Sequence, residues 1–264
     1  MFFAIINPIF VNVSRETIAQ GAVMLRTETP EVEDRRLKLE LRLAQMGEVE
    51  GCREDFLKYV RKVWPEFIAG AHHKMIAKKF EDIANGKIKR LIINMPPRHT
   101  KSEFASYLLP SWIIGREPKT KIIQTTHTAE LAVNFGRKVR NLIATTEYQN
   151  IFDSVDLQSD SKAAGRWSTN HGGEYFAAGV GGAITGRGAD LLIIDDPHSE
   201  QDALSDTAME HAYEWYTSGP RQRLQPGGAI VIVMTRWSLK DLTEKVLKAQ
   251  GYDDQADKWE VIEF

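Results

Sequence analysis

The sequence predicts an α/β protein built on a mostly parallel sheet with helices on both faces, preceded by a helical N-terminal segment over residues 1–60. Three observations lead to this fold class. Short apolar runs without alternation recur within residues 61–264, helix-period segments separate them, and chemically active polar residues follow the runs directly. Strand–helix alternation of this kind predicts parallel pairing, and such sheets bind ligands at the carboxyl ends of their strands.

The first expected elements are helices. Thr29-Pro30 and the acidic residues after it are typical of a capped helix start, and the helical pattern continues to about residue 62, with the Gly47 and Gly51 region separating two helices. A third helix is expected over residues 71–84, because Asn85-Gly86 is typical of a C-cap.

The expected strands follow: four are short runs of mostly apolar residues, and the fifth is the mixed segment over residues 259–263. They cover residues 91–95, 121–125, 191–194, 229–234 and 259–263. Leu131, Phe135, Val139 and Leu142 recur at helical spacing and predict a helix between the second and third of these strands. Trp167 and the glycine-rich residues 179–188 have neither pattern and are expected to form a mobile loop.

Composition excludes several protein classes. The chain has 264 residues and a formal net charge of −2, so bulk positive charge does not hold it on nucleic acid. The single cysteine, Cys52, excludes an intrachain disulfide and is compatible with a reducing compartment. No apolar run has the roughly 20 residues that a membrane-spanning helix needs, so we expect no membrane association.

The first strand leads into a loop that carries a lysine and a hydroxyl residue. The loop is Met95-Pro96-Pro97-Arg98-His99-Thr100-Lys101-Ser102. In a P-loop, the lysine at this place binds the β- and γ-phosphates, and the hydroxyl binds Mg²⁺. Both glycines of the usual motif are missing, with Met95 and Thr100 in their places. The alternative is therefore a Lys-Ser pair that merely begins a solvated helix.

Two adjacent carboxylates, Asp195 and Asp196, directly follow the third strand. A metal-nucleotide site needs this pair, because one acid holds Mg²⁺ and its water shell while the next orients the attacking water. A helix N-cap would explain one aspartate but not both. The fourth strand ends in Thr235-Arg236, where a hydroxyl can sense the γ-phosphate, although an ordinary polar strand end is the alternative. Together these strand ends predict an ATP- and Mg²⁺-binding P-loop NTPase of the ASCE/RecA-like type.

The same strand ends resemble the ATPase domain of the terminase large subunit, the DNA-packaging motor of tailed bacteriophages. The resemblance runs from about residue 64 to the C-terminus. It depends on four motifs: Gly70-Ala71-His72-His73, Pro96-Pro97-Arg98-His99-Thr100-Lys101-Ser102, Thr185-Gly186-Arg187-Gly188-Ala189-Asp190 with Asp195-Asp196-Pro197, and Thr235-Arg236-Trp237.

The resemblance implies roles for individual residues. The nucleotide-binding loop covers Pro97, Arg98, His99, Thr100, Lys101 and Ser102, with Ser102 and Asp195 as the Mg²⁺ ligands. Asp196 is the expected catalytic carboxylate, with Glu200 as the fallback, and Thr235 and Arg236 couple γ-phosphate loss to movement. His72 and His73 are expected to line the adenine pocket, or to form a solvated helix start.

Thr100 stands where family members usually have glycine. Because a β-branched residue disfavours positive φ, we expect a tighter loop, or one that closes only around nucleotide. Arg187 lies in a glycine-flanked turn, where related motors supply an arginine to the ATP of a neighbouring subunit. The alternative is a structural arginine paired with Asp190.

The resemblance also implies partners and a location. The partners are double-stranded DNA, the portal protein and the small terminase subunit, with a homo-oligomeric ring on the portal and a monomer in isolation. The place of action is the host cell cytoplasm, on the procapsid. We expect no nuclease domain within these residues and no DNA cleavage by them. Residues 87–90 and 137–140 are basic and are candidates for DNA contact.

Two other functions remain open. A P-loop phosphotransferase such as a small-molecule kinase would use the same lysine and acids but would need a substrate lid. A degenerate, non-hydrolysing nucleotide-binding module would explain the missing glycines. The retained Lys101, Ser102, Asp195 and Asp196 oppose the second of these.

Overall fold

The computed structural model describes residues 29–184, 186–252 and 256–264. Residues 1–28 of the expected helical N-terminal segment and Thr185 of the glycine-rich motif lie outside the described part. By internal contacts the chain divides into two units, residues 1–48 and 49–264. In the first unit, the described residues form the exposed beginning of helix α2 (Pro30–Glu54).

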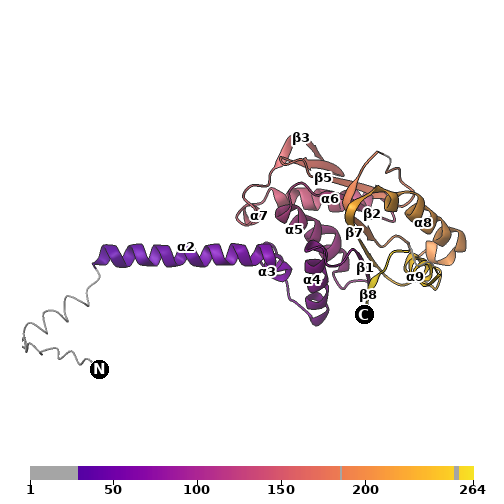
Figure 1. Cartoon of the computed structure of the whole chain (residues 1–264), viewed down its shortest axis with the longest axis horizontal. Helices are drawn as coiled ribbons and strands as arrows, with labels where there is room; N and C mark the ends of the chain where they lie inside the picture. Colours follow the sequence, from indigo (N-terminus) through magenta and orange to yellow (C-terminus); the bar gives the residue numbers. More distant parts are fainter. Residues whose placement is uncertain (1–28, 185, 253–255) are drawn as a thin grey trace, which may run out of the picture. The chain divides into compact units, whose positions relative to one another are not determined.

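The second unit is a mixed α/β domain around an eight-stranded, mostly parallel sheet (Figure 1). Its strands are β1 (Arg90–Asn94), β2 (Lys121–Thr126), β3 (Leu157–Ala163), β4 (Arg166–Thr169), β5 (Glu174–Gly179), β6 (Ala189–Asp195), β7 (Leu224–Met234) and β8 (Glu260–Glu263). They lie in the order β3-β4-β5-β2-β6-β7-β1-β8, and only the pairs β3–β4 and β4–β5 are antiparallel.

The remaining elements are helical. They are α3 (Phe56–Val63), α4 (Ala71–Ala84), the π-helix η1 (Glu103–Leu108), α5 (Leu109–Arg116), α6 (Ala129–Ile143), α7 (Thr146–Gln149), the short 3₁₀ helices η2 (Asp202–Leu204) and η3 (Pro220–Arg223), α8 (Asp206–Ser218) and α9 (Leu242–Tyr252).

Strand order confirms the predicted fold class. One strand, β7, separates β1, which leads into the lysine loop, from β6, which ends in the acidic pair, and β8 lies on the far side of β1. The five expected strands all form. The apolar runs of β1, β2, β6 and β7 are buried on both faces of the sheet, whereas β8, the last strand in the order, is buried only at Ile262.

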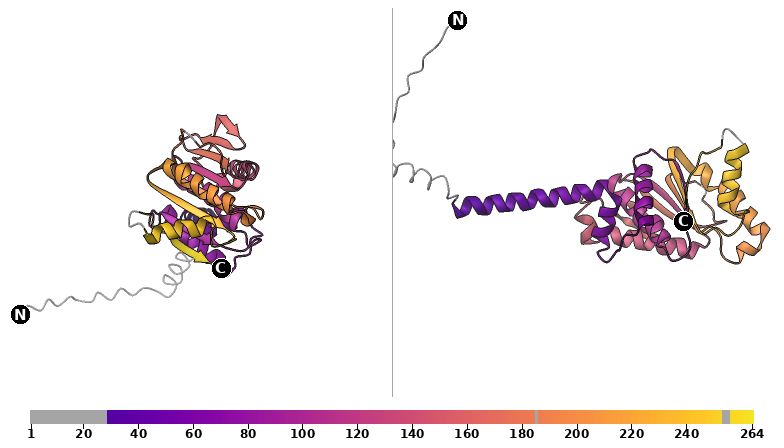
Figure 2. Two further views of the ribbon diagram at one scale, coloured as in Figure 1. Left: turned by 90° about the vertical axis from the view of Figure 1, so that its right-hand side faces the viewer. Right: turned by 90° about the horizontal axis from the view of Figure 1, so that it is seen from below.

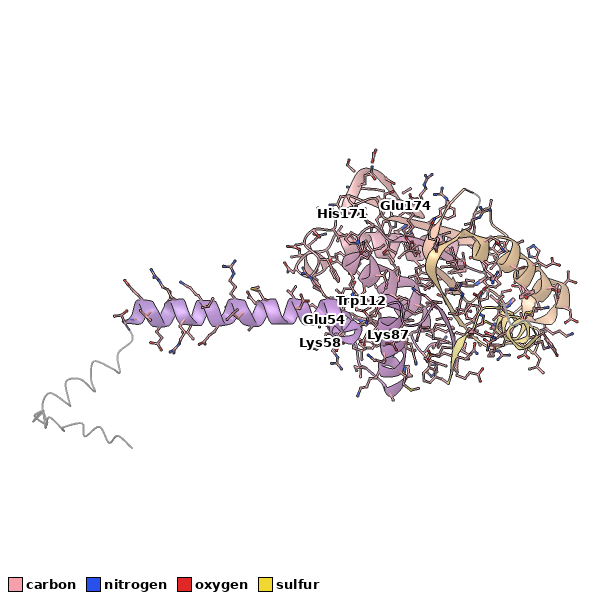
Figure 3. All side chains as sticks on the ribbon, viewed as in Figure 1. Glu54, Lys58, Lys87, Trp112, His171 and Glu174 are labelled. Atoms are coloured by element: carbon pink, nitrogen blue, oxygen red, sulfur yellow. The ribbon has the colours of Figure 1, made fainter. Side chains whose placement is uncertain are left out.

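Helices cover both faces of the sheet, with α4, α5 and α6 on one side and α8 and α9 on the other (Figure 2). Successive strand residues face opposite cores: Leu91 and Ile93 join the α3–α6 side, whereas Ile92 joins the α8–α9 side. Trp112 of α5, labelled in Figure 3, is fully buried and donates from Nε1 to the carbonyl of Cys52 at 2.9 Å. No helix among the described residues is long and apolar enough to cross a membrane.

Two local expectations are wrong. The helix break expected at Gly47 and Gly51 lies instead at Asp55, because α2 continues through both glycines. Asp55 leaves the helical region at φ −109° and ψ 113°, and its side chain caps α3 by accepting from the Lys58 amide.

Trp167 does not belong to a mobile loop. It lies in β4, is fully buried, stacks on Tyr175 with ring centroids 4.9 Å apart and donates from Nε1 to the carbonyl of Gly136 at 3.0 Å. Strands β3 and β4 were not predicted, because β3 is polar and mostly exposed and β4 has only four residues.

Candidate functional site

The loop after β1 holds two non-glycine residues in the left-handed backbone region. Arg98 has φ 64° and Thr100 has φ 61°. The expectation that Thr100 avoids positive φ is therefore wrong. A left-handed non-glycine residue costs on the order of 1–3 kcal/mol and persists only where its surroundings hold it in place.

A chain of hydrogen bonds holds Thr100 in this conformation. The Gly70 amide donates to Nδ1 of His73 at 2.8 Å, so the ring proton of neutral His73 is on Nε2. Nε2 donates to the Thr100 hydroxyl at 2.6 Å, and that hydroxyl donates to the carbonyl of His99 at 2.6 Å. Burial, with smaller contributions from His72 and His99, lowers the pKa of His73 to about 4. His73 is therefore neutral near pH 7 and braces the loop from the start of α4.

Lys101 is buried and is held by groups from two other strand ends. Its Nζ pairs with Oδ2 of Asp196 at 2.8 Å and donates to Oγ1 of Thr235 at 3.2 Å. Asp196 has φ 41°, and its Oδ1 accepts from the Thr235 amide at 2.9 Å. The ends of β1, β6 and β7 thus meet at one charged cluster.

Asp195, the last residue of β6, is 1% exposed and accepts two hydroxyl hydrogen bonds. Ser102 donates to its Oδ1 at 2.9 Å and Ser106 donates to its Oδ2 at 2.6 Å. Gln124, from the centre of β2, donates from Nε2 to the Ser106 hydroxyl at 2.9 Å. Burial, and then repulsion from Asp196, raises the pKa of Asp195 to about 7.

Arg236 lies beside this cluster but makes a different set of contacts. Its guanidinium pairs with Asp241 at 2.9 Å, Glu244 at 3.0 Å and Glu263 at 3.2 Å, so it ties the end of β7 to α9 and β8. A cavity of about 570 Å³ opens next to it at the carboxyl ends of β1, β7 and β8. Pro97, Trp237 and Phe264 are among its lining residues.

Glu200 and Arg187 are not among the side chains that contact Lys101 or Asp195. Glu200 is exposed in the turn after β6. The Arg187 guanidinium lies 4.1 Å from the ring centroid of Phe176 and 3.9 Å from Oε2 of Glu174, the first residue of β5, which Figure 3 labels. Asp190, its expected alternative partner, instead accepts from the Lys121 amide.

Arg187 therefore lies at the amino-terminal edge of the sheet, whereas the Lys101 cluster lies at the carboxyl-terminal edge. Arg187 comes two residues before β6 and Asp195 ends that strand, so a rise of about 3.3 Å per residue puts their backbones roughly 20 Å or more apart. Arg187 cannot reach the cluster of its own chain in this arrangement.

The donor chemistry of the cluster fits Mg²⁺ bound together with phosphate. Ser102 and Asp195 present oxygen atoms, which Mg²⁺ prefers. Within the described residues no group of three or more His, Cys, Asp or Glu side chains could hold a metal alone. Since Mg²⁺ in phosphoryl-transfer sites uses one or two protein ligands plus phosphate oxygens, this small donor set is what such a site needs.

Two contributors to the cluster were not found from the sequence. Ser106 is one helical turn after Ser102, and Gln124 interrupts the apolar run of β2. A buried amide in a central strand is a signal that could have directed attention to Gln124, because buried polar groups need partners.

Comparison with solved structures finds similar chains. No protein-family model matches the sequence, and no curated protein matches it. The structure is similar to the crystal structure of the HK97 bacteriophage large terminase, with 14% sequence identity and a TM-score of 0.47. The match covers 75% of this chain and 42% of that chain, so this chain spans less than half of that protein's length.

Proposed function

We propose that this chain carries the ATP-hydrolysing motor domain of a viral DNA-packaging terminase large subunit. The observation that carries the proposal is the cluster at three adjacent strand ends, where Lys101 contacts both Asp196 and Thr235 while Ser102 contacts Asp195. The packaging role is supported by the sequence motifs that resemble that family. DNA, the portal protein and the small terminase subunit are its proposed partners.

ATP would bind with its phosphates on the loop 97–102 and its nucleoside in the cavity beside the loop. Lys101 is the proposed ligand of the β- and γ-phosphates, and Arg98 adds positive charge on the same loop. Ser102 and Asp195 would hold Mg²⁺, which neutralises charge on the phosphate oxygens.

The contact between Lys101 and Asp196 suggests how binding prepares the reaction. In this structure the Asp196 carboxylate lies 2.8 Å from Lys101 Nζ. When a phosphate oxygen binds Lys101, it replaces that negative charge. The released Asp196 carboxylate is then free to orient the attacking water. Because Thr235 contacts both Lys101 and Asp196, loss of the γ-phosphate changes its surroundings directly. Arg236, next in sequence, would pass this change to α9 and β8.

Arg187 acts on a neighbouring subunit in this proposal, because it lies at the opposite edge of its own sheet. A ring then completes each site with an arginine from the next chain. Activity per molecule should rise with protein concentration.

The test is phosphate release by the purified chain with Mg²⁺ and ATP, over a range of protein concentrations, with and without linear double-stranded DNA. We expect Lys101→Ala to reduce hydrolysis by on the order of 10²–10³-fold, because it removes a phosphate ligand. Lys74→Ala, at an exposed lysine of α4, is the matched control and should retain activity.

Two results would redirect the proposal. Nucleotide binding without hydrolysis at any concentration would favour the degenerate module. Hydrolysis that neither DNA nor protein concentration changes would oppose a packaging motor and favour another P-loop enzyme.

A further inference from the structure

Both carboxylate oxygens of Asp195 are held by serines of the helix that follows the loop, but only Ser102 belongs to the Lys-Ser pair of the P-loop. The second serine, Ser106, is fully buried and makes the shorter hydrogen bond, at 2.6 Å. We propose that Ser106 and Gln124 are positioning residues that fix Asp195 for Mg²⁺ binding, an inference that rests on the proposed function.

The direction of each hydrogen bond is determined by proton count. A serine hydroxyl has one proton. When Asp195 is ionised, as Mg²⁺ binding requires, the Ser106 proton goes to Oδ2 because a carboxylate can only accept. The Ser106 oxygen must therefore accept from Gln124, which identifies the atom 2.9 Å away as the amide nitrogen. The result is a relay in one direction, from Gln124 through Ser106 to Asp195.

Gln124 has an orientation that serves this relay rather than stability. It is fully buried in the middle of the sheet, and among the described residues its Oε1 has no hydrogen-bond partner. An unpaired buried carbonyl is unfavourable, and an apolar side chain of the same shape would avoid the cost. The orientation of the Gln124 amide therefore serves its Nε2 hydrogen bond to Ser106.

The backbone supports the same conclusion. Ser102 is the N-cap residue of the π-helix η1 and Ser106 lies within its first turn, so the two serines, four residues apart, lie on nearly the same face. π-Helical turns are rare and occur frequently at functional sites. One helix thereby supplies a metal-side hydroxyl and a second hydroxyl that prevents the carboxylate from rotating.

The consequence for Mg²⁺ follows from this geometry. Ser102 can present a lone pair to the metal while its hydroxyl still donates to Oδ1 of Asp195. Without Ser106, Oδ2 would be buried with no donor, and the carboxylate plane would be free to turn away. Loss of residues that orient a metal ligand typically reduces metal affinity by on the order of 10–100-fold.

The experiment measures the affinity of the chain for a fluorescent ATP analogue in excess Mg²⁺ and again in excess EDTA. The ratio of the two dissociation constants is the magnesium enhancement, which is independent of catalysis. We expect Ser106→Ala to lower this enhancement by on the order of 10–100-fold while the affinity in EDTA stays unchanged. The matched control is Ser111→Ala, at a fully buried serine of the adjoining helix α5 that bonds to Tyr59 and to the Leu108 carbonyl instead.

Gln124→Met is a second, independent variant, and we do not expect it to destabilise the chain. It removes the relay donor and the unpaired carbonyl together, so the enhancement should fall while the thermal unfolding midpoint stays level or rises. A lower midpoint with unchanged enhancement would overturn the relay. If Ser106→Ala does not fold, this variant decides alone.

The outcomes separate the relay from the proposed function. A wild-type chain with no magnesium enhancement would refute the Mg²⁺–nucleotide site itself. Enhancement in the wild type that Ser106→Ala and Ser111→Ala retain equally would refute the relay and leave that site intact.

Discussion

Neutral His73 braces the loop after β1, and the free energy of unfolding should therefore decrease as the pH falls, because His73 must then take up a proton. The pKa of His73 is lowered from 6.5 to about 4 in the folded chain. Between these values the unfolded chain binds a proton that the folded chain does not, so stability is complete above pH 6.5 and declines as the pH falls towards 4. Going from about pH 7.5 to about pH 5 should cost about 2 kcal/mol from this residue.

The assay is urea unfolding of the wild type and of His73→Gln across this pH range. Glutamine can donate to Thr100 and accept from the Gly70 amide, but it does not titrate, so the variant should lose most of this 2 kcal/mol dependence. Asp195 and His198 also have shifted pKa values, but they are common to both proteins and cancel in the comparison. His211→Gln, at an exposed histidine of α8, is the control and should keep the wild-type dependence.

Identical pH dependence in the wild type and His73→Gln would refute the reasoning. It would mean that His73 accepts a proton in the folded chain without cost, and that a neutral ring is not what holds Thr100.

Three further predictions concern the loop after β1, the proposed supply of an arginine between subunits, and the glycine before β5. Thr100→Ala should destabilise the chain by about 1 kcal/mol more than Thr100→Gly in chemical unfolding, because both lose the hydroxyl but only alanine keeps the strain of positive φ. Arg187→Ala should abolish the rise of hydrolysis with protein concentration and leave nucleotide affinity unchanged; an unchanged rise would exclude an arginine supplied between subunits. Gly173→Ala should cost at least about 2 kcal/mol, since its Cβ would lie 2.3 Å from the Pro118 carbonyl oxygen, whereas Gly47→Ala, with no atom within 4 Å, should be neutral or stabilising.

The sequence was sufficient to predict the central strands and the polar strand ends. Those strands are buried on both faces, so their composition is apolar throughout, and a parallel sheet brings their carboxyl ends together. The antiparallel extension β3–β4 was not predicted, because β3 carries polar residues on an exposed surface and lacks that signal.

The details of the site depend on contacts between residues far apart in the chain. Local preference argues against positive φ at Thr100, but a hydrogen bond from His73, 27 residues earlier, overrides it. The contact between Gln124 and Ser106 spans 18 residues and depends on how β2 packs beside the loop helix. Neither contact leaves a periodic pattern from which it could be predicted.

The central claim is that Asp196 is both the resting partner of Lys101 and the carboxylate that orients water. Asp196→Asn tests it most directly, with ATP affinity and phosphate release measured on the same preparation. The account predicts that the variant binds ATP at least as tightly as the wild type, because the competing negative charge beside Lys101 is gone, while phosphate release falls by on the order of 10²-fold or more. Phosphate release at the wild-type rate would contradict the account.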